Sequence, residues 1–229
     1  MNKPYLSLTI KECGEPLVPI PSGPFLLLEP HAYASLGAPY GHNSPWMARQ
    51  SVVAGLHAAA RELQKKHPGW QLAIFDAYRP RAVQKFMVDR ETQHWMSTEG
   101  LSHDAAFEKA LRIWAMPSDD PATPPLHSTG GAVDVTLADE TGALMNMGSP
   151  IDENSDRSNP DYFAHAVDDL GQQAHQNRQR LNTLMAAQGF TRHLAEWWHF
   201  GLGTQYCAWV QRQQLGGNPV AIYGRADLL

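Results

Sequence analysis

Two short stretches of the chain carry side chains that could bind a metal ion. The stretch H-S-T-G-G-A-V-D at 127–134 and the stretch E-W-W-H-F at 196–200 each contain one imidazole and one carboxylate. Zinc binds imidazole nitrogen and carboxylate oxygen, and a catalytic zinc site uses three protein ligands and leaves one position for water. His127, Asp134 and His199 would supply two nitrogens and one oxygen. The two stretches together therefore predict a catalytic zinc site.

Glu196 has a different expected role, because the three ligands already complete the protein part of the site. A carboxylate outside the metal shell can act as the base that takes a proton from the zinc-bound water. A lone E-x-x-H pair or a lone H-x-x-G-x-x-x-D pattern is more often incidental. Both occur here, each with a glycine beside a predicted strand edge, and the combination favours a metal site.

The spacing within each stretch places a constraint on the backbone. The two polar residues are seven positions apart in the first stretch and three apart in the second, and side chains at odd separations on a flat strand point to opposite faces. They can converge only if the chain turns or bulges between them. Gly130 and Gly131 accommodate such a change in the first stretch. In the second stretch we expect a bend or a strand end near Trp198.

Hydrophobic patterning predicts the elements that must position these residues. Apolar residues at helical spacing, compact apolar runs and turn-forming residues divide the chain into helices and strands. A proline-dense segment at 117–126 is expected to form a wall or lid beside the site. The predicted elements are strands at 25–28, 70–75, 132–138 and 190–200, and helices at 47–66, from near Pro80, from an N-cap at Ser102 to before Pro117, and at about 165–188.

Helices and strands alternate without a strict βαβ order, which favours the α+β class with a central antiparallel sheet flanked by helices. We expect one domain over residues 1–229. Within it, residues 1–45 form an irregular N-terminal segment, and residues 204–229 form a C-terminal extension.

Composition excludes several classes of protein. The 229 residues are 43% hydrophobic, which suffices for a sizeable core, and the net charge of -5 without a basic run predicts neither a nucleic-acid nor a membrane partner. The start of the chain is a poor signal peptide, and Cys13 and Cys207 are the only cysteines, so we expect a cytoplasmic protein. The nine histidines outside the two stretches, among them His31 and His193, are expected in loops or on solvated helix faces.

Four blocks of sequence together resemble the zinc D-alanyl-D-alanine dipeptidases of the VanX type. These enzymes share a superfamily with zinc D,D-carboxypeptidases, phage endopeptidases and the Hedgehog signalling domain. The two stretches above match the superfamily. D-A-Y-R-P at 76–80 and M-G-S-P-I-D at 147–152 are similar to two further blocks of the dipeptidases. The resemblance covers roughly residues 46–203, and it implies a Hedgehog/D,D-peptidase-like fold.

The resemblance also implies a role for each matching residue. One zinc ion per chain would be held by the three ligands named above, and Glu196 would act as general base and then as general acid. Arg79 would stabilise the oxyanion that forms when water attacks the peptide carbonyl. Asp152 would hold the free amino group of a dipeptide substrate. Asp76, Tyr78 and Trp198 are expected to support the site. Asp76 is expected to orient Arg79 or to cap the turn.

The sequence departs from the family pattern at two positions. Many members have a serine two residues before the first zinc histidine, where this chain has Pro125. That serine can contribute a substrate hydrogen bond, so its replacement leaves the exact dipeptide preference open. The second departure is Ile151, which stands where phenylalanine is usual.

Two alternatives to a D-alanyl-D-alanine dipeptidase remain at this point. One is a zinc D,D-carboxypeptidase or L,D-endopeptidase that acts on longer peptidoglycan peptides. The other is a non-catalytic, zinc-stabilised binding module, although such a module has no need of Glu196 or Arg79. The sequence leaves open whether the cell uses the activity for cell-wall recycling, nutrition or resistance. It also leaves the oligomeric state open, with a homodimer among the permitted assemblies.

Overall fold

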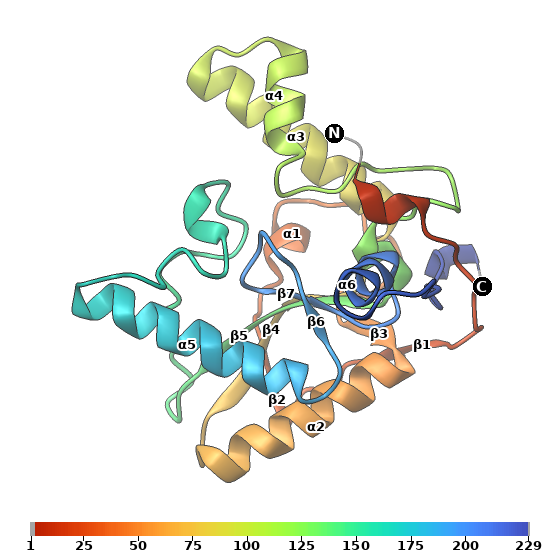
Figure 1. The fold of residues 1–229 in the computed structure, drawn as a ribbon. Coiled ribbons are helices and arrows are strands. Elements are labelled where there is room, and N and C mark those ends of the chain that lie inside the picture. Colours follow the sequence, from red (N-terminus) through yellow and green to blue (C-terminus); the bar gives the residue numbers. More distant parts are fainter. Residues whose placement is uncertain (1–2, 229) are drawn as a thin grey trace.

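A five-stranded sheet lies at the centre of the computed structural model, which describes residues 3–228 (Figure 1). The first two strands in the sheet are parallel and every other neighbouring pair is antiparallel. The predicted α+β class is thus confirmed, and the sheet is antiparallel except at one edge. In spatial order the strands are β2 (Phe25–Leu27), β4 (Gln71–Asp76), β5 (Ala132–Ala138), β7 (His199–Gly201) and β6 (Thr191–Arg192).

Two long helices, α2 (Gln50–Lys66) and α5 (Asp169–Ala186), contact the sheet and each other. In Figure 1 they lie together below the sheet, while α3 (Arg81–Glu99) and α4 (His103–Ala110) project above it. Within residues 3–228, no helix has both the length and the apolar character needed to cross a membrane. The remaining elements are η1 (Pro4–Ser7), β1 (Leu17–Pro19), α1 (Ala32–Ser35), β3 (Met47–Arg49), η2 (Leu126–Thr129), η3 (Asp156–Ser158), α6 (Gln205–Leu215) and η4 (Ala226–Leu228).

Strand β5 is buried on both faces, and this decides where the polar residues of the site point. Its side chains alternate, so Val133 and Val135 belong to the main hydrophobic core together with residues of α2. Ala132 lies on the opposite face, in a small cluster with Tyr5 and other aromatic and aliphatic side chains. Asp134 shares the face of Ala132. The functional side chains therefore lie on the face of the sheet that α2 does not cover.

Several predicted boundaries are wrong for identifiable reasons. The helix predicted from Met47 begins at Gln50, because residues 47–49 pair with β1 as strand β3. Helix α5 begins at Asp169 instead of about 165, because the side chain of Asp168 accepts a hydrogen bond from Gly171 N at 2.8 Å and caps the helix there. The predicted N-cap at Ser102 is confirmed, although α4 ends at Ala110, well before Pro117.

The strand predicted at 190–200 is present only at its two ends. Residues 191–192 form β6, residues 199–201 form β7, and the two short strands pair with each other. The chain between them, residues 193–198, forms a loop. This loop carries Glu196, so the strand prediction was wrong for the segment that matters most to the site.

A fully buried arginine, Arg49, joins four distant parts of the chain. Its Nε donates to the carbonyl oxygen of Thr129 at 2.7 Å, and its Nη2 donates to that of Gly224 at 3.0 Å. Both terminal nitrogens also bind the carboxylate of Glu12 at 3.0 Å. Thr129 is the last residue of η2, the short helix that carries His127. Arg49 therefore holds in place the short helix that carries His127, one of the predicted metal ligands.

We predict that Arg49→Met lowers the free energy of unfolding by about 3 kcal/mol, because two buried carbonyl groups and one carboxylate lose their donor. Urea unfolding followed by tryptophan fluorescence measures this change. Arg61→Met is the matched control, because Arg61 is exposed on α2. Equal unfolding midpoints for the two variants would contradict the role assigned to Arg49.

Candidate metal centre and active site

The sheet brings two of the predicted metal ligands directly opposite each other. Asp134 on β5 pairs with His199 on β7 in the antiparallel register, and paired residues point to the same face. His127 lies on η2, outside the sheet, and Gly130 with a φ of +70° turns the chain into β5. The predicted change of direction at the glycine pair is confirmed. The predicted strand end near Trp198 is also confirmed, because β7 begins at the next residue.

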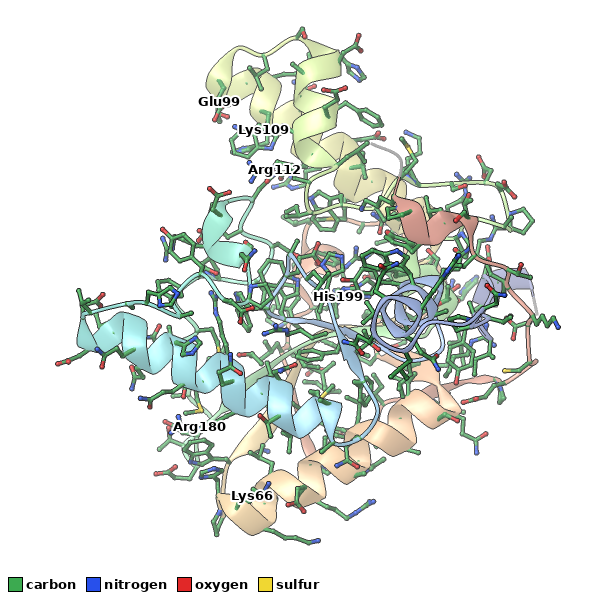
Figure 2. The ribbon with its side chains drawn as sticks, in the orientation of Figure 1. Lys66, Glu99, Lys109, Arg112, Arg180 and His199 are labelled. Carbon is green, nitrogen blue, oxygen red and sulfur yellow. The ribbon has the colours of Figure 1, made fainter. Side chains whose placement is uncertain are left out.

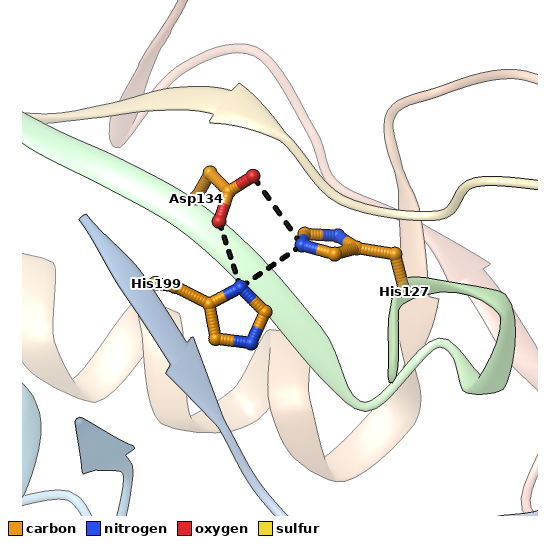
Figure 3. A group of neighbouring side chains, drawn as sticks. All are labelled: His127, Asp134 and His199. Carbon is orange, nitrogen blue, oxygen red and sulfur yellow. Dashed lines mark hydrogen bonds and ion pairs between the residues drawn. The ribbon is translucent and has the colours of Figure 1, made fainter. Parts of the chain in front are cut away.

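The three side chains form one compact, buried group (Figure 3). His127 Nε2 lies 3.1 Å from His199 Nδ1 and 3.3 Å from Asp134 Oδ2, and His199 Nδ1 lies 3.1 Å from Asp134 Oδ1. All three ligand atoms are within 4.8 Å of one another. Two imidazole nitrogens and one carboxylate oxygen are a donor set that zinc accepts. Figure 2 places His199 near the middle of the molecule, among densely packed side chains.

Hydrogen bonding orients His127 for metal binding. Its Nδ1 lies 2.7 Å from the carbonyl oxygen of Ala77, an atom that can only accept. Nδ1 must therefore carry the proton, and Nε2 presents its lone pair to Asp134 and His199. A backbone carbonyl behind a metal-binding imidazole fixes its tautomer and its ring orientation. Burial would raise the pKa of Asp134, but the imidazoles of His127 and His199 lower it below its usual range.

A β-bulge places a second aspartate in line with this group. Ile74 of β4 pairs with Val135, but the next pair joins Asp76 to Asp134, because the register shifts between Ile74 and Asp76. Without the bulge, Phe75 would stand opposite Asp134. Asp76 is fully buried, and its Oδ2 lies 3.5 Å from His127 Nδ1. The bulge therefore replaces an aromatic ring with a carboxylate at the centre of the site.

Asp76 binds Arg79, the predicted oxyanion-stabilising residue. Asp76 Oδ2 accepts from Nε of Arg79 at 3.0 Å and from Nη2 at 2.6 Å, and Gln84 Oε1 accepts from Nη1 at 2.9 Å. Nη2 lies 3.5 Å from Asp134 Oδ2, at the edge of the metal group. The guanidinium also lies over the rings of Tyr33 and Trp114, 4.9 and 5.0 Å from their centroids. Arg79 is thus held rigidly beside the metal ligands.

Glu196 lies in the loop before β7 and faces the same group. It is buried, and its Oε2 is 3.8 Å from His199 Nδ1. Burial and, to a smaller extent, the nearby charge of Asp134 together raise the pKa of Glu196 to about 8, against the opposing charge of Lys3. A carboxyl group with a pKa near neutrality can both accept and return a proton.

His193 is a neighbour of Glu196 that the sequence prediction missed. It was expected in a loop or on a solvated helix face. It does lie in a loop, but it is half-buried there, and its Nδ1 lies 3.7 Å from Glu196 Oε1. Burial lowers the pKa of His193 well below its usual value, and the neighbouring His199 adds to this effect. His193 therefore stays neutral beside the acid. The only sequence signal was its spacing of three residues from Glu196, which is too common to be informative.

Asp152, the predicted amine-binding residue, enters the site from the loop that contains M-G-S-P-I-D. Its φ is +66°, and it is the only non-glycine residue with positive φ in the described chain. Its Oδ2 accepts a hydrogen bond from the Tyr33 hydroxyl at 2.7 Å. Burial and, to a smaller extent, the charge of Asp134 together raise the pKa of Asp152 to about 7. The unusual backbone conformation is thus combined with a shifted pKa at one residue, which is typical of functional sites.

A buried arginine on α5 holds this loop in place. Arg178 donates to the carbonyl oxygens of Met147 and Asn159, each at 2.7 Å, and to that of Arg157 at 2.9 Å. Its three acceptors lie on both sides of Asp152 in the sequence. Arg178 therefore fixes the two ends of the loop whose middle reaches the site.

One pocket contains nearly all the predicted site residues. Tyr78 and Asp76 are the two exceptions. Tyr78 is buried but lies outside the pocket lining, and burial together with the charge of Asp227 raises its pKa. Asp76 supports the pocket from behind without lining it. Among the residues that line the pocket are Arg79, His127, Asp134, Asp152, Glu196, Trp198 and His199.

Other lining and supporting residues lacked a sequence signal. His31 was expected in a loop or on a solvated helix face. It does lie in a loop, just before α1, but it is 6% exposed and its Nε2 lies 3.1 Å from Asp76 Oδ1. Lys3 and Tyr5 line the pocket although they precede every recognised motif by many residues. Long-range packing brings these residues to the site, and a local sequence pattern does not encode such packing.

Comparison with known proteins assigns the chain to a family. The model of the Peptidase_M15 family, described as D-ala-D-ala dipeptidase, matches residues 27–215. The chain is 40% identical to a D-alanyl-D-alanine dipeptidase of Synechocystis, over 98% of this chain and 97% of that protein. It is 33% identical to a D-alanyl-D-alanine dipeptidase of Enterococcus faecium, over 66% of this chain and 73% of that protein.

Among solved structures, the chain is similar to VanYB in complex with D-alanine-D-alanine. The two share 15% sequence identity with a TM-score of 0.46, over 93% of each chain. Because these values are low, the assignment rests on the family model and on the sequence relatives. The chain belongs to the Peptidase_M15 family of D-ala-D-ala dipeptidases.

Proposed function

We propose that this protein is a zinc-dependent dipeptidase that hydrolyses D-alanyl-D-alanine or a closely related free dipeptide to two amino acids. The observation that carries this proposal is the buried group of His127, Asp134 and His199, with Glu196 on one side and Arg79 on the other. The names of the sequence relatives support the choice of substrate.

The three ligands suit one zinc ion per chain. Their ligand atoms are close enough to share an ion, and the proton on His127 Nδ1 leaves Nε2 free to coordinate it. When bound, zinc supplies a Lewis acid that polarises the peptide carbonyl and lowers the pKa of its water toward about 7.

Glu196 is the proposed general base and acid. Its carboxylate accepts the proton of the attacking water and later delivers a proton to the leaving amine, and its raised pKa suits both steps. His193 stays neutral, so it does not place a positive charge next to this base. Arg79 stabilises the negative charge that develops on the carbonyl oxygen, and its fixed position means that little reorganisation is needed as this charge appears.

Asp152 is the proposed recognition site for the free ammonium group of the substrate. It lines the same pocket as the metal ligands, and the Tyr33 hydroxyl fixes its carboxylate. An ammonium group would lower the raised pKa of Asp152 and so favour its ionised form. This requirement for a free amine favours a dipeptidase over a carboxypeptidase or endopeptidase, because longer peptides carry an amide at that position.

Free thiols support a reducing location. Cys13 and Cys207 form no disulfide. Cytoplasmic proteins normally keep their cysteines reduced. We therefore propose that the protein acts in the cytoplasm.

A panel of free dipeptides, L,L through D,D, tests the function when each is assayed with zinc and after chelation. We expect zinc-dependent hydrolysis that is fastest for D-Ala-D-Ala, and loss of that hydrolysis for N-acetyl-D-Ala-D-Ala. Asp152→Asn should raise the KM for the free dipeptide roughly 10- to 100-fold, because the ammonium group loses its charged partner. Equal rates on the free and acetylated compounds would favour a carboxypeptidase, and no zinc-dependent hydrolysis would favour a binding module.

We predict that Glu196→Gln lowers kcat by roughly 10²- to 10⁴-fold while zinc remains bound, because the amide keeps the shape of the side chain and cannot accept the proton. Activity assays paired with metal analysis of the purified protein measure both quantities. Glu140→Gln is the matched control, because Glu140 is exposed in the turn after β5. A Glu196→Gln variant that hydrolyses D-Ala-D-Ala at the parent rate would exclude Glu196 as the base.

A further inference from the structure

A segment from the start of the described chain forms part of the pocket. Residues 3–8, which we call the strap, include η1 and contact α6. Tyr5 of the strap is buried against Tyr206 of α6, with ring centroids 5.4 Å apart in an edge-to-face arrangement. Lys3 and Tyr5 line the pocket together with the metal ligands. The strap is therefore a wall of the site that lies far from the motifs in sequence.

The strap is anchored firmly enough to position a side chain. The buried Gln205 of α6 donates from its Nε2 to the carbonyl oxygen of Leu8 at 2.7 Å and to that of Ala122 at 2.9 Å. This amide thus joins the strap to the proline-dense segment. Further along the chain, Lys11 N donates to the carbonyl oxygen of Ala221 at 2.8 Å. The chain is thus fixed at Tyr5 and at Leu8, two and five positions after Lys3, and this limits where Lys3 can lie.

The charge of the pocket lining leaves Lys3 available to bind an anion. Besides histidines, the lining contains two cationic side chains, Arg79 and Lys3. Arg79 is already engaged by Asp76 and Gln84. Among residues 3–228, the ion pairs of Glu196 are with His193 and His199, and Lys3 takes part in none. Lys3 is half-buried, so its ammonium group gains more from a charged partner than a fully solvated lysine does.

A second donor in the lining also lacks an acceptor. The indole Nε1 of Trp114 is buried and has no hydrogen-bond partner in the described chain. A buried donor without an acceptor is costly and is usually satisfied by a ligand or water. The residues that line the pocket thus include an ammonium group without an ion-pair partner and an indole whose N–H lacks an acceptor. A carboxylate can satisfy either donor.

A free dipeptide carries an ammonium group at one end and a carboxylate at the other. The ammonium group is assigned above to Asp152, and the carboxylate needs a cation that the catalytic residues do not already use. We propose that Lys3 of the strap binds the C-terminal carboxylate of the dipeptide substrate. This inference rests on the proposed function and adds a specificity-determining residue to it.

The strap also separates the metal pocket from a second cavity. Lys3, Tyr5 and Ala115 line both spaces, and residues of the proline-dense segment, among them Pro124 and Pro125, line the second one. In this proposal, the ammonium group of Lys3 at the boundary between the two spaces marks the position of the C-terminus of a dipeptide substrate. Binding of the terminal carboxylate there selects substrates of two residues, because a longer peptide would place an uncharged amide next to Lys3.

The test compares D-Ala-D-Ala with its C-terminal amide, D-Ala-D-Ala-NH2, on the zinc-loaded full chain. We expect the wild type to prefer the free acid in kcat/KM by roughly 10- to 100-fold, since a hydrogen bond between charged groups contributes that much. Lys3→Gln should abolish this preference by raising the KM for the acid but not for the amide. The charge of Lys3 also lowers the pKa of Glu196, and loss of that effect should change the kcat for the acid and for the amide by the same factor. Lys3→Arg should restore most of the preference.

Lys11→Gln is the matched control, because Lys11 is an exposed lysine eight residues further along the chain. It should keep the wild-type preference for the acid. Thermal melting and zinc content of each variant report on folding separately. The assignment is overturned if Lys3→Gln keeps the acid preference, or if it lowers the kcat/KM of the acid and the amide equally, since a structural role would affect both. A wild type that hydrolyses neither compound would instead overturn the proposed function itself.

Discussion

The compensation of buried negative charge is the constraint on which the rest of this structure depends. Asp76, Asp134 and Glu196 lie buried within one region, and Asp152 lines the same pocket. Ionised carboxylates so close together repel one another unless cations accompany them. Burial is the main cause of the raised pKa values of Asp152 and Glu196, and the charge of Asp134 contributes to both shifts. Arg79 offsets part of the charge, and the zinc ion proposed among the three ligands would offset more of it.

The fold meets this constraint by assembling the site from several elements that are each fixed independently. Pairing of β5 with β7 sets Asp134 opposite His199, and the bulge in β4 adds Asp76 to the same row. The other residues come from irregular segments, which could drift without support. Buried arginines supply that support: Arg49 holds the turn that carries His127, and Arg178 holds the loop that carries Asp152. The precision of the site therefore comes from buried polar contacts as much as from the hydrophobic core.

The sequence predicted the motifs well and their surroundings less well. Strand β5 alternates clearly, so its position was predictable, and the parity argument correctly required a turn at the glycine pair and a strand end near Trp198. The bulge at Phe75 has no signal in the sequence, because it is a shift in the register between β4 and its partner strand β5. The predicted strand at 190–200 failed for a related reason: its apolar residues are buried in a loop, and hydrophobicity alone does not distinguish a buried loop from a strand.

Residues that reach the site over long distances were the least predictable. His31 was expected in a loop or on a solvated helix face without a role in the site, and only the tertiary structure places it against Asp76. Lys3 and Tyr5 reach the pocket because α6, near the other end of the chain, holds the strap. The family resemblance, which covers roughly residues 46–203, does not include these residues. The substrate range of this protein is therefore expected to depend in part on segments that the motifs do not cover.

The central claim is that two imidazoles and one aspartate share a single zinc ion, with Glu196 beside it and outside its coordination shell. Anomalous X-ray scattering from zinc-loaded crystals, measured on both sides of the zinc absorption edge, tests this claim most directly. The account predicts one strong peak per chain, about 2.0–2.2 Å from His127 Nε2, His199 Nδ1 and one oxygen of Asp134. A peak elsewhere in the chain, or a zinc ion coordinated directly by the Glu196 carboxylate, would contradict it.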